Sequence, residues 1–162
     1  MMPAIKNTYL KLLFSMFLLP AFFSCDKSKE PVSATSKNPN EITFISLSNI
    51  GGDQGDYKII KVTKDSIHAE QGITARQIHK EWDSAISMQT WNNLISPINT
   101  KELDVIESSP SKQSVDGIDE TFQIRTPKKS HIYVNSYADT LHYRQLNLFK
   151  EQLNLILPTE YR

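Results

Sequence analysis

Two carboxylates and an imidazole alternate with other side chains over one short stretch of the chain. His79, Glu81 and Asp83 are each two residues apart, so a strand would turn all three toward one face. Imidazole and carboxylate groups bind zinc, although only adjacent members of such a triplet lie close enough to share one ion. The solvent-facing side of an antiparallel sheet shows the same polar alternation. We therefore predict an exposed polar strip without tight metal binding, and a metal site at His79, Glu81 and Asp83 is the alternative.

Other residues that are capable of chemistry are dispersed along the chain. Residues 51–56 read Gly-Gly-Asp-Gln-Gly-Asp, but they lack the Lys-Ser/Thr of a phosphate-binding loop and the acid spacing of an EF-hand. Asp116, Asp119 and Glu120 would be the paired acids of a glycosidase-like site, whereas Asp116 followed by glycine is typical of a turn. The sequence therefore predicts a glycine-rich loop at residues 49–56, no catalytic residue and no cofactor. The remaining histidines form no recognised metal motif: His68, His131 and His142.

The only cysteine in the chain stands at the end of a short apolar stretch. Lys6 and Lys11 precede this stretch, which runs over residues 12–23. A helix of about 12 residues covers roughly 18 Å, whereas a bilayer core of about 30 Å needs about 20 residues. A positive start, a short apolar middle and the small residue Ser24 predict a secretory signal peptide. The ordinary signal peptidase fits poorly here, because bulky Phe22 occupies the third position before the cut.

Phe22-Phe23-Ser24-Cys25 resembles the lipobox of bacterial lipoproteins, in the form that bacteroidetes use. The resemblance implies that residues 1–24 are a cleaved signal peptide and that the sulfur of Cys25 carries diacylglycerol. It also implies a third acyl chain, such as palmitate, on the new amino terminus. Because two or more acyl chains anchor a protein stably, we expect the protein at the cell envelope, on the outer membrane rather than the inner membrane. An uncleaved hydrophobic N-terminus with an incidental cysteine is the alternative.

Composition separates a tether from a single domain. Residues 26–40 contain Val32 as their only large apolar residue and cannot bury enough surface to order themselves. Residues 25–40 are therefore predicted to be the lipidated cysteine and a flexible tether, and residues 41–162 one globular domain. From Cys25 onward the chain has 16 basic and 18 acidic side chains, a balance that argues against nucleic-acid binding. A single cysteine excludes an internal disulfide and a cysteine-based zinc site.

Strand patterns dominate the domain. Lys64-Asp65 is typical of a two-residue hairpin turn between two of the strands. In the fourth strand, the side that carries Trp82 would also carry Ile78, Lys80 and Ser84, opposite the His79 side. Alternating or β-branched residues predict strands at residues 42–48, 57–63, 66–70, 77–85, 122–126 and 132–134.

Two helices are predicted among these strands. Ser87 is a suitable N-cap for the first helix, and apolar residues at helical spacing follow it up to Pro97. Pro158 ends the second helix. Strands interrupted by two helices, without βαβ alternation, predict an α+β fold, with an antiparallel β-sheet of about five to six strands and two helices packed on one face. In the second helix one apolar face is formed by Leu146, Phe149, Leu153 and Ile156, and is expected to be widened by Leu141, Leu148, Leu155 and Leu157.

The order of elements resembles that of emfourin-type domains, which are proteinaceous inhibitors of thermolysin-like metalloproteases. The resemblance covers residues 42–157. It rests on the glycine-rich loop after the first strand, on Trp91 in the first helix, and on the hairpin of residues 122–134 before a leucine-rich helix. It implies a related fold, and no inhibitory residue can be matched.

Together these patterns indicate a membrane-anchored lipoprotein with a non-catalytic binding domain. Its expected partners are the membrane, through the lipid anchor, and an envelope protein or a small ligand. Two alternatives remain: an envelope hydrolase whose site residues converge only in three dimensions, and an inhibitor of an extracellular protease. A cleft with convergent buried acids or histidines would favour the hydrolase.

Overall fold

The computed structural model describes residues 38–162. The predicted signal peptide (residues 1–24), Cys25 and the predicted tether up to residue 37 lie outside the described residues. Thr159–Tyr161 forms a 3-10 turn, η5, after the last helix. The described strands and α-helices are β1 Phe44–Gly51, β2 Asp56–Val62, β3 Ser66–Ile73, β4 Ile78–Ala85, α2 Met88–Ile95, β5 Ile118–Arg125, β6 Ser130–Val134 and α3 Arg144–Ile156.

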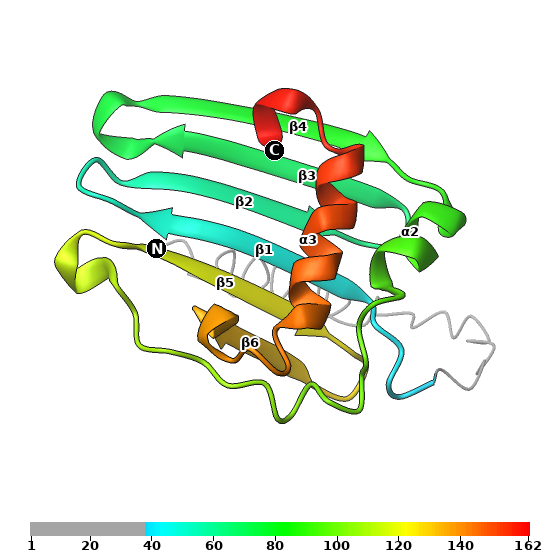
Figure 1. Ribbon diagram of the computed structural model, residues 1–162. Coiled ribbons are helices and arrows are strands. Elements are labelled where there is room, and N and C mark those ends of the chain that lie inside the picture. The colour runs from blue at the N-terminus through cyan, green and yellow to red at the C-terminus, as the bar shows by residue number, and fades with distance from the viewer. Residues whose placement is uncertain (1–37) are drawn as a thin grey trace, which may run out of the picture. The chain divides into compact units, whose positions relative to one another are not determined.

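The strands form one antiparallel sheet in the spatial order β4-β3-β2-β1-β5-β6. Both helices lie against the same face of this sheet, and α3 crosses several strands obliquely (Figure 1). The predicted α+β class is therefore confirmed. The predicted hairpin turn at Lys64-Asp65 is also present, because the Thr63 amide donates to the Ser66 carbonyl oxygen over 2.9 Å.

The face of the sheet beneath the helices is apolar. Leu47 on β1 lies opposite Ile60 on β2 and opposite Phe122 on β5, and all three side chains are buried. The rings of Phe122 and of Phe149 on α3 meet edge to face, with 6.3 Å between their centroids, an arrangement that aromatic rings favour. Burial of this apolar surface is the main favourable term in folding.

Both helices begin or end where the sequence predicts, but the apolar face of α3 is narrower than expected. The Ser87 hydroxyl caps α2 by accepting from the Thr90 amide over 3.0 Å. Leu157 is buried as predicted. The expectation that Ile156 belongs to the buried face, widened by Leu148 and Leu155, is wrong, because a helix packed on one side buries only one stripe. Leu141, also expected to widen it, precedes α3 and is exposed. The exposed fractions are 78 % for Leu141, 37 % for Leu148, 79 % for Leu155 and 36 % for Ile156.

Four of the strands, β1, β3, β5 and β6, are longer than the sequence predicts. β1 continues to Gly51, and β5 already begins at Ile118. The predicted loop at 49–56 therefore shrinks to the residues between Gly51 and Asp56. Pairing explains this extension, since Gly51 lies opposite both Asp56 and Ile118. A Cβ on Gly51 would come within 2.1 Å of the Gly117 carbonyl oxygen, so only glycine fits where the two strands approach.

The domain carries its own core. Ser36–Arg162 forms a compact unit, and every buried apolar residue of the described chain lies between Ile42 and Tyr161. This unit therefore contains all the apolar packing needed to fold without the residues that precede it. No helix within residues 38–162 combines the length and the apolar character that crossing a bilayer requires.

Candidate functional site

Toward one end of the sheet, the face that carries the helices changes from apolar to polar. Five adjacent strands each contribute one residue to a row across the sheet, and neighbouring members lie opposite each other in the strand register. Each member stands two residues from a side chain that packs in or against the core, so it also points toward the helix-bearing side. We call these residues the polar row: Glu120 on β5, Asn49 on β1, Lys58 on β2, Gln71 on β3 and Lys80 on β4.

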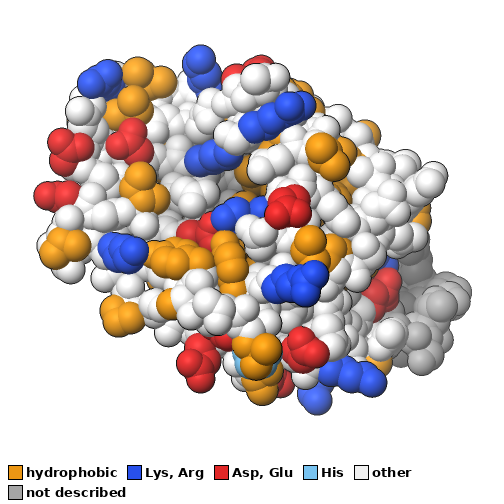
Figure 2. Space-filling model, viewed as in Figure 1, with side chains coloured by type: hydrophobic (Ala, Val, Ile, Leu, Met, Phe, Trp, Pro, Cys, Tyr) orange, Lys and Arg blue, Asp and Glu red, His pale blue; other side chains and the backbone are white. Residues whose placement is uncertain are grey.

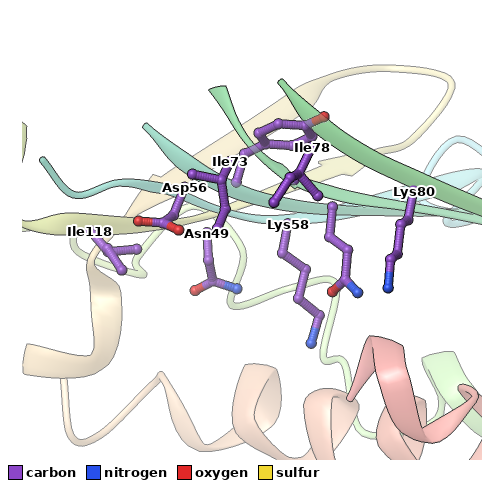
Figure 3. A pocket seen from close by; sticks show the side chains of 10 residues that line it. Asn49, Asp56, Lys58, Ile73, Ile78, Lys80 and Ile118 are labelled. Carbon is purple, nitrogen blue, oxygen red and sulfur yellow. The ribbon is translucent and has the colours of Figure 1, made fainter. Parts of the chain in front are cut away.

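A cleft of about 370 Å³ opens where the helices no longer cover the sheet. The polar row lines it from Asn49 to Lys80, and the residues at the strand ends complete its lining. Asn49, Lys58 and Lys80 extend from the strands toward the helix layer (Figure 3), and Figure 2 shows this face hollowed beside a group of basic side chains. The strand-end residues that face the cleft are Asp56, Ile73, Ile78 and Ile118.

The C-terminal turn η5 lies beside the polar row. The side-chain amide of Gln71 donates to the Glu160 carbonyl oxygen over 2.8 Å. Next to it, the ring of Tyr161 packs against Trp82 with 6.3 Å between ring centroids. These contacts hold the end of the chain beside β3 and β4, so that η5 borders the polar row without covering it.

Two lysines of the polar row have no carboxylate partner. Among the ion pairs formed within residues 38–162, none includes Lys58 or Lys80. Lys58 is partly buried, and this burial, with a smaller contribution from the charge of Lys150, holds the pKa of Lys58 below its usual value. The cleft therefore presents ammonium groups that the surrounding protein does not neutralise.

The third nearby lysine is neutralised. Lys150 on α3 forms an ion pair with Glu120, and its ammonium group lies 3.1 Å from the Tyr143 hydroxyl. Tyr143 donates to the other carboxylate oxygen of Glu120 over 2.7 Å. Burial lowers the pKa of Lys150, but the bonds to Glu120 and Tyr143 outweigh burial and raise that pKa overall. This cluster connects Glu120, at the β5 end of the polar row, to α3. The Glu120 carboxylate is therefore already paired with Lys150 and Tyr143.

The predicted polar strip lies on the opposite face of the sheet. His79, Glu81 and Asp83 alternate with Trp82 on β4, as predicted, and their side chains are 51 %, 64 % and 72 % exposed. The Asp83 carboxylate lies 2.8 Å from Nδ1 of His68 on the neighbouring strand β3. Within residues 38–162, no group of three metal-binding side chains is placed to hold an ion.

The imidazole of His79 on β4 bonds to the hydroxyl of Tyr57, which lies across β3 on β2, and its Nε2 is 3.6 Å from the Glu81 carboxylate. Its Nδ1 lies 2.6 Å from the Tyr57 hydroxyl, and the two rings stack. Tyr57 lies over Gly72, where an added Cβ would come within 2.5 Å of the Tyr57 hydroxyl oxygen. A glycine on β3 therefore makes room for the tyrosine that orients His79.

The dispersed acids are not brought together as a catalytic pair. Asp116 adopts the left-handed conformation of a turn residue, with φ at 56°, which confirms its predicted turn role. Asp119 and Glu120 are consecutive on β5 and so point to opposite faces. Asp119 accepts from the Lys112 amide over 2.8 Å, and also from Ser111 and Asn135. These bonds, the Lys112 amide first, hold the pKa of Asp119 below its usual value.

The other histidines lie apart from one another. His131 is buried on β6, and burial lowers its pKa. His142 lies before α3 and bonds to Asp139 through Nδ1 at 3.0 Å.

Sequence reasoning placed Lys58 and Lys80 on strands but left Asn49, Gln71 and Glu120 outside the predicted strands, and it did not recognise the row as a site. Its members are far apart in the chain, and only the strand register aligns them. The available signal was a polar residue at each position where strand alternation calls for an apolar one, such as Lys58 two residues before Ile60. Comparison with protein-family models gave no match, and neither did comparison with curated proteins. Interpretation of the site therefore depends on its geometry.

Proposed function

We propose that the chain is a lipid-anchored lipoprotein of a bacterial cell envelope and that its domain is a non-catalytic binding module. The observation that carries the proposal is the cleft of about 370 Å³ whose floor is the polar row. Small-molecule sites are concave, measure about 300–1,000 Å³, and combine apolar walls with a few well-placed polar groups. The cleft has this size and this mixture of side chains.

The position of the polar row also favours binding over a structural role. Apolar burial provides most of the driving force for folding, and the ammonium groups of Lys58 and Lys80 add none. Lys58 and Lys80 form no ion pair within the described chain, so they do not stabilise the domain through one either. Ammonium and amide groups at a cleft floor are suited to hold a ligand, which is why we favour a binding module over a hydrolase.

The anchor is tested with Cys25→Ala, alongside Ser24→Ala, which keeps a small residue before the cysteine. Both variants and the wild type would be labelled with palmitate, fractionated and weighed by mass spectrometry. We expect lipid and membrane attachment in the wild type and Ser24→Ala, and loss of both in Cys25→Ala. A Cys25→Ala protein that stays as membrane-bound as the wild type, with unprocessed mass, would indicate an uncleaved hydrophobic N-terminus instead.

The binding role is tested on the compact unit of residues 36–162. Its ¹⁵N-labelled form would be titrated with small anionic, cationic and neutral organic compounds of similar size. We expect amide shifts to concentrate at Asn49, Lys58, Gln71 and Lys80, and to fall on few residues elsewhere. Shifts that gather on α2 or on the His79 side of the sheet would contradict the assignment of the cleft.

A further inference from the structure

The charges around the cleft are unequal. Of the side chains that line it, Lys58 and Lys80 are positive and Asp56 alone is negative. Lys150, which lies at the β5 end of the polar row, is neutralised by Glu120. The Asp56 carboxylate lies over the β1–β2 turn, where a Cβ added to Gly52 would come within 2.9 Å of it. The cleft floor is therefore positive between β2 and β4.

Register places the two free lysines at a useful separation. Lys58 lies opposite Gln71, and Gln71 lies opposite Lys80, so two strand spacings of about 4.8 Å separate their backbones by roughly 10 Å. Figure 3 shows both lysine side chains hanging from the sheet in the same direction. Two flexible four-carbon side chains at this spacing can bring their ammonium groups to one anionic group between them.

An amide at one side of the pair adds a hydrogen-bond donor. The side-chain amide of Asn49 lines the cleft beside Lys58 and has no hydrogen-bond partner within the described chain. Asn49 therefore offers a free N–H donor beside the two ammonium groups.

Apart from Asp56, the outer part of the cleft is apolar. Ile73, Ile78 and Ile118 line it at the strand ends, and the exposed fractions are 41 % for Ile78 and 50 % for Ile118. An apolar group that covered these side chains would remove their surface from water, which is favourable in proportion to the area buried. The cleft thus combines a cationic floor with an apolar mouth.

We infer that the cleft binds a small amphipathic anion, in which a carboxylate or phosphate contacts Lys58 and Lys80 while a short apolar body covers Ile73, Ile78 and Ile118. This inference rests on the proposed binding function and specifies the chemical class of the ligand. The same chemistry is present in a free organic acid or phosphate ester and in the headgroup region of an anionic lipid, and the test separates these sources.

The test uses residues 36–162, which contain the complete core, and four probes with one six-carbon chain. Hexyl phosphate, hexanoate, hexyltrimethylammonium and hexanol would each be titrated by NMR, together with inorganic phosphate. We expect the two hexyl anions to shift the polar-row amides, inorganic phosphate to bind more weakly, and the cation and the alcohol to leave the lysine amides unshifted. Affinity for the anions is expected to fall as salt rises.

Lysine variants provide the matched comparison. Lys58→Met and Lys80→Met are each expected to weaken hexyl phosphate binding by about tenfold or more, because each variant removes a charge-assisted hydrogen bond to the phosphate. Lys61→Met is the control, because Lys61 lies on the same strand as Lys58 but points to the opposite face and pairs with Glu70. Its affinity should match the wild type, and all three variants should keep the wild-type thermal unfolding curve within a few degrees.

A second arm uses vesicles of phosphatidylglycerol and phosphatidylethanolamine. If the domain sediments with these vesicles and Lys58→Met abolishes this sedimentation, the source of the anion is an anionic lipid headgroup. If the domain binds the hexyl anions but not the vesicles, the source is a soluble metabolite. Equal binding of hexanol and hexyl phosphate in the cleft would overturn the inference and leave the proposed binding function standing. No shift in the cleft with any probe would overturn both.

Discussion

The carboxylate of Glu120 on β5 accepts a hydrogen bond from the hydroxyl of Tyr143, which immediately precedes α3, over 2.7 Å. The same carboxylate pairs with Lys150, which lies about two turns further along the chain on α3. A sheet residue thus contacts two side chains from the α3 region, at the point where the apolar interface ends and the cleft begins. This contact connects α3 to β5 beside the cleft.

Glu120→Gln is expected to lower the free energy of unfolding by about 1–3 kcal/mol, because Lys150 then loses its counter-charge and remains partly buried. Lys150→Met should also destabilise, since it leaves the Glu120 side chain, only 9 % exposed, with an uncompensated charge. The double variant should lose less than the sum of the two single losses. Urea unfolding of the four proteins measures this coupling, and strictly additive losses would mean that the ion pair does not stabilise the fold.

Phe149→Ala should cost about 3–5 kcal/mol, because it removes a fully buried ring that packs against Phe122. Leu155→Ala on the same helix is the control, since Leu155 is 79 % exposed and surface changes stay within about 0.5 kcal/mol. Thermal and urea unfolding would give both values. Similar losses for the two variants would mean that α3 does not face the sheet as described.

Acid should destabilise the domain through Asp139. Its carboxylate accepts from the backbone amides of His142 and Glu107, and these bonds lower the pKa of Asp139 to about 2. Because the folded-state pKa lies below that of the unfolded chain, this stabilisation is complete above the ordinary pKa near 4 and is lost as pH falls toward about 2. Asp119 acts in the same direction.

Asp139→Asn should therefore be less stable than the wild type at neutral pH and show a shallower loss of stability below about pH 4. It should retain the part of the acid sensitivity that Asp119 contributes. Urea midpoints measured from about pH 6 to about pH 2 provide the comparison. Parallel curves for the two proteins would exclude Asp139 as a source of acid sensitivity.

The polar strip on β4 is predicted to bind no divalent metal tightly. Replacing His79, Glu81 and Asp83 together with serine should remove the Tyr57–His79 and His68–Asp83 contacts and cost little stability, because all three side chains are largely exposed. Isothermal titration of residues 36–162 with zinc and calcium is the measurement. Stoichiometric binding that the triple variant abolishes would establish a metal site there and favour the hydrolase.

Local patterns in the sequence were sufficient for much of the fold. Alternation identified the strands, Ser87 marked the start of α2 and Pro158 the end of α3, because capping and proline geometry act over a few residues. The extent of β1, β3 and β5 was underestimated, since residues such as Gly51 join a strand only when partners on both sides supply hydrogen bonds. The width of the apolar face on α3 was overestimated for a similar reason: Leu155 has the right type, but no neighbour covers it.

By itself the sequence determined the α+β class, the order of the elements and the two faces of β4, each of which depends on the side-chain period of one segment. It also predicts the lipid anchor, because a lipobox is a motif of consecutive residues. Only the tertiary structure decided that Asn49, Lys58, Gln71 and Lys80 share one row, since the register between strands brings together residues that lie up to 31 positions apart in the sequence. Register depends on the pairing of whole strands over a common core, so no single segment contains the information that creates the cleft.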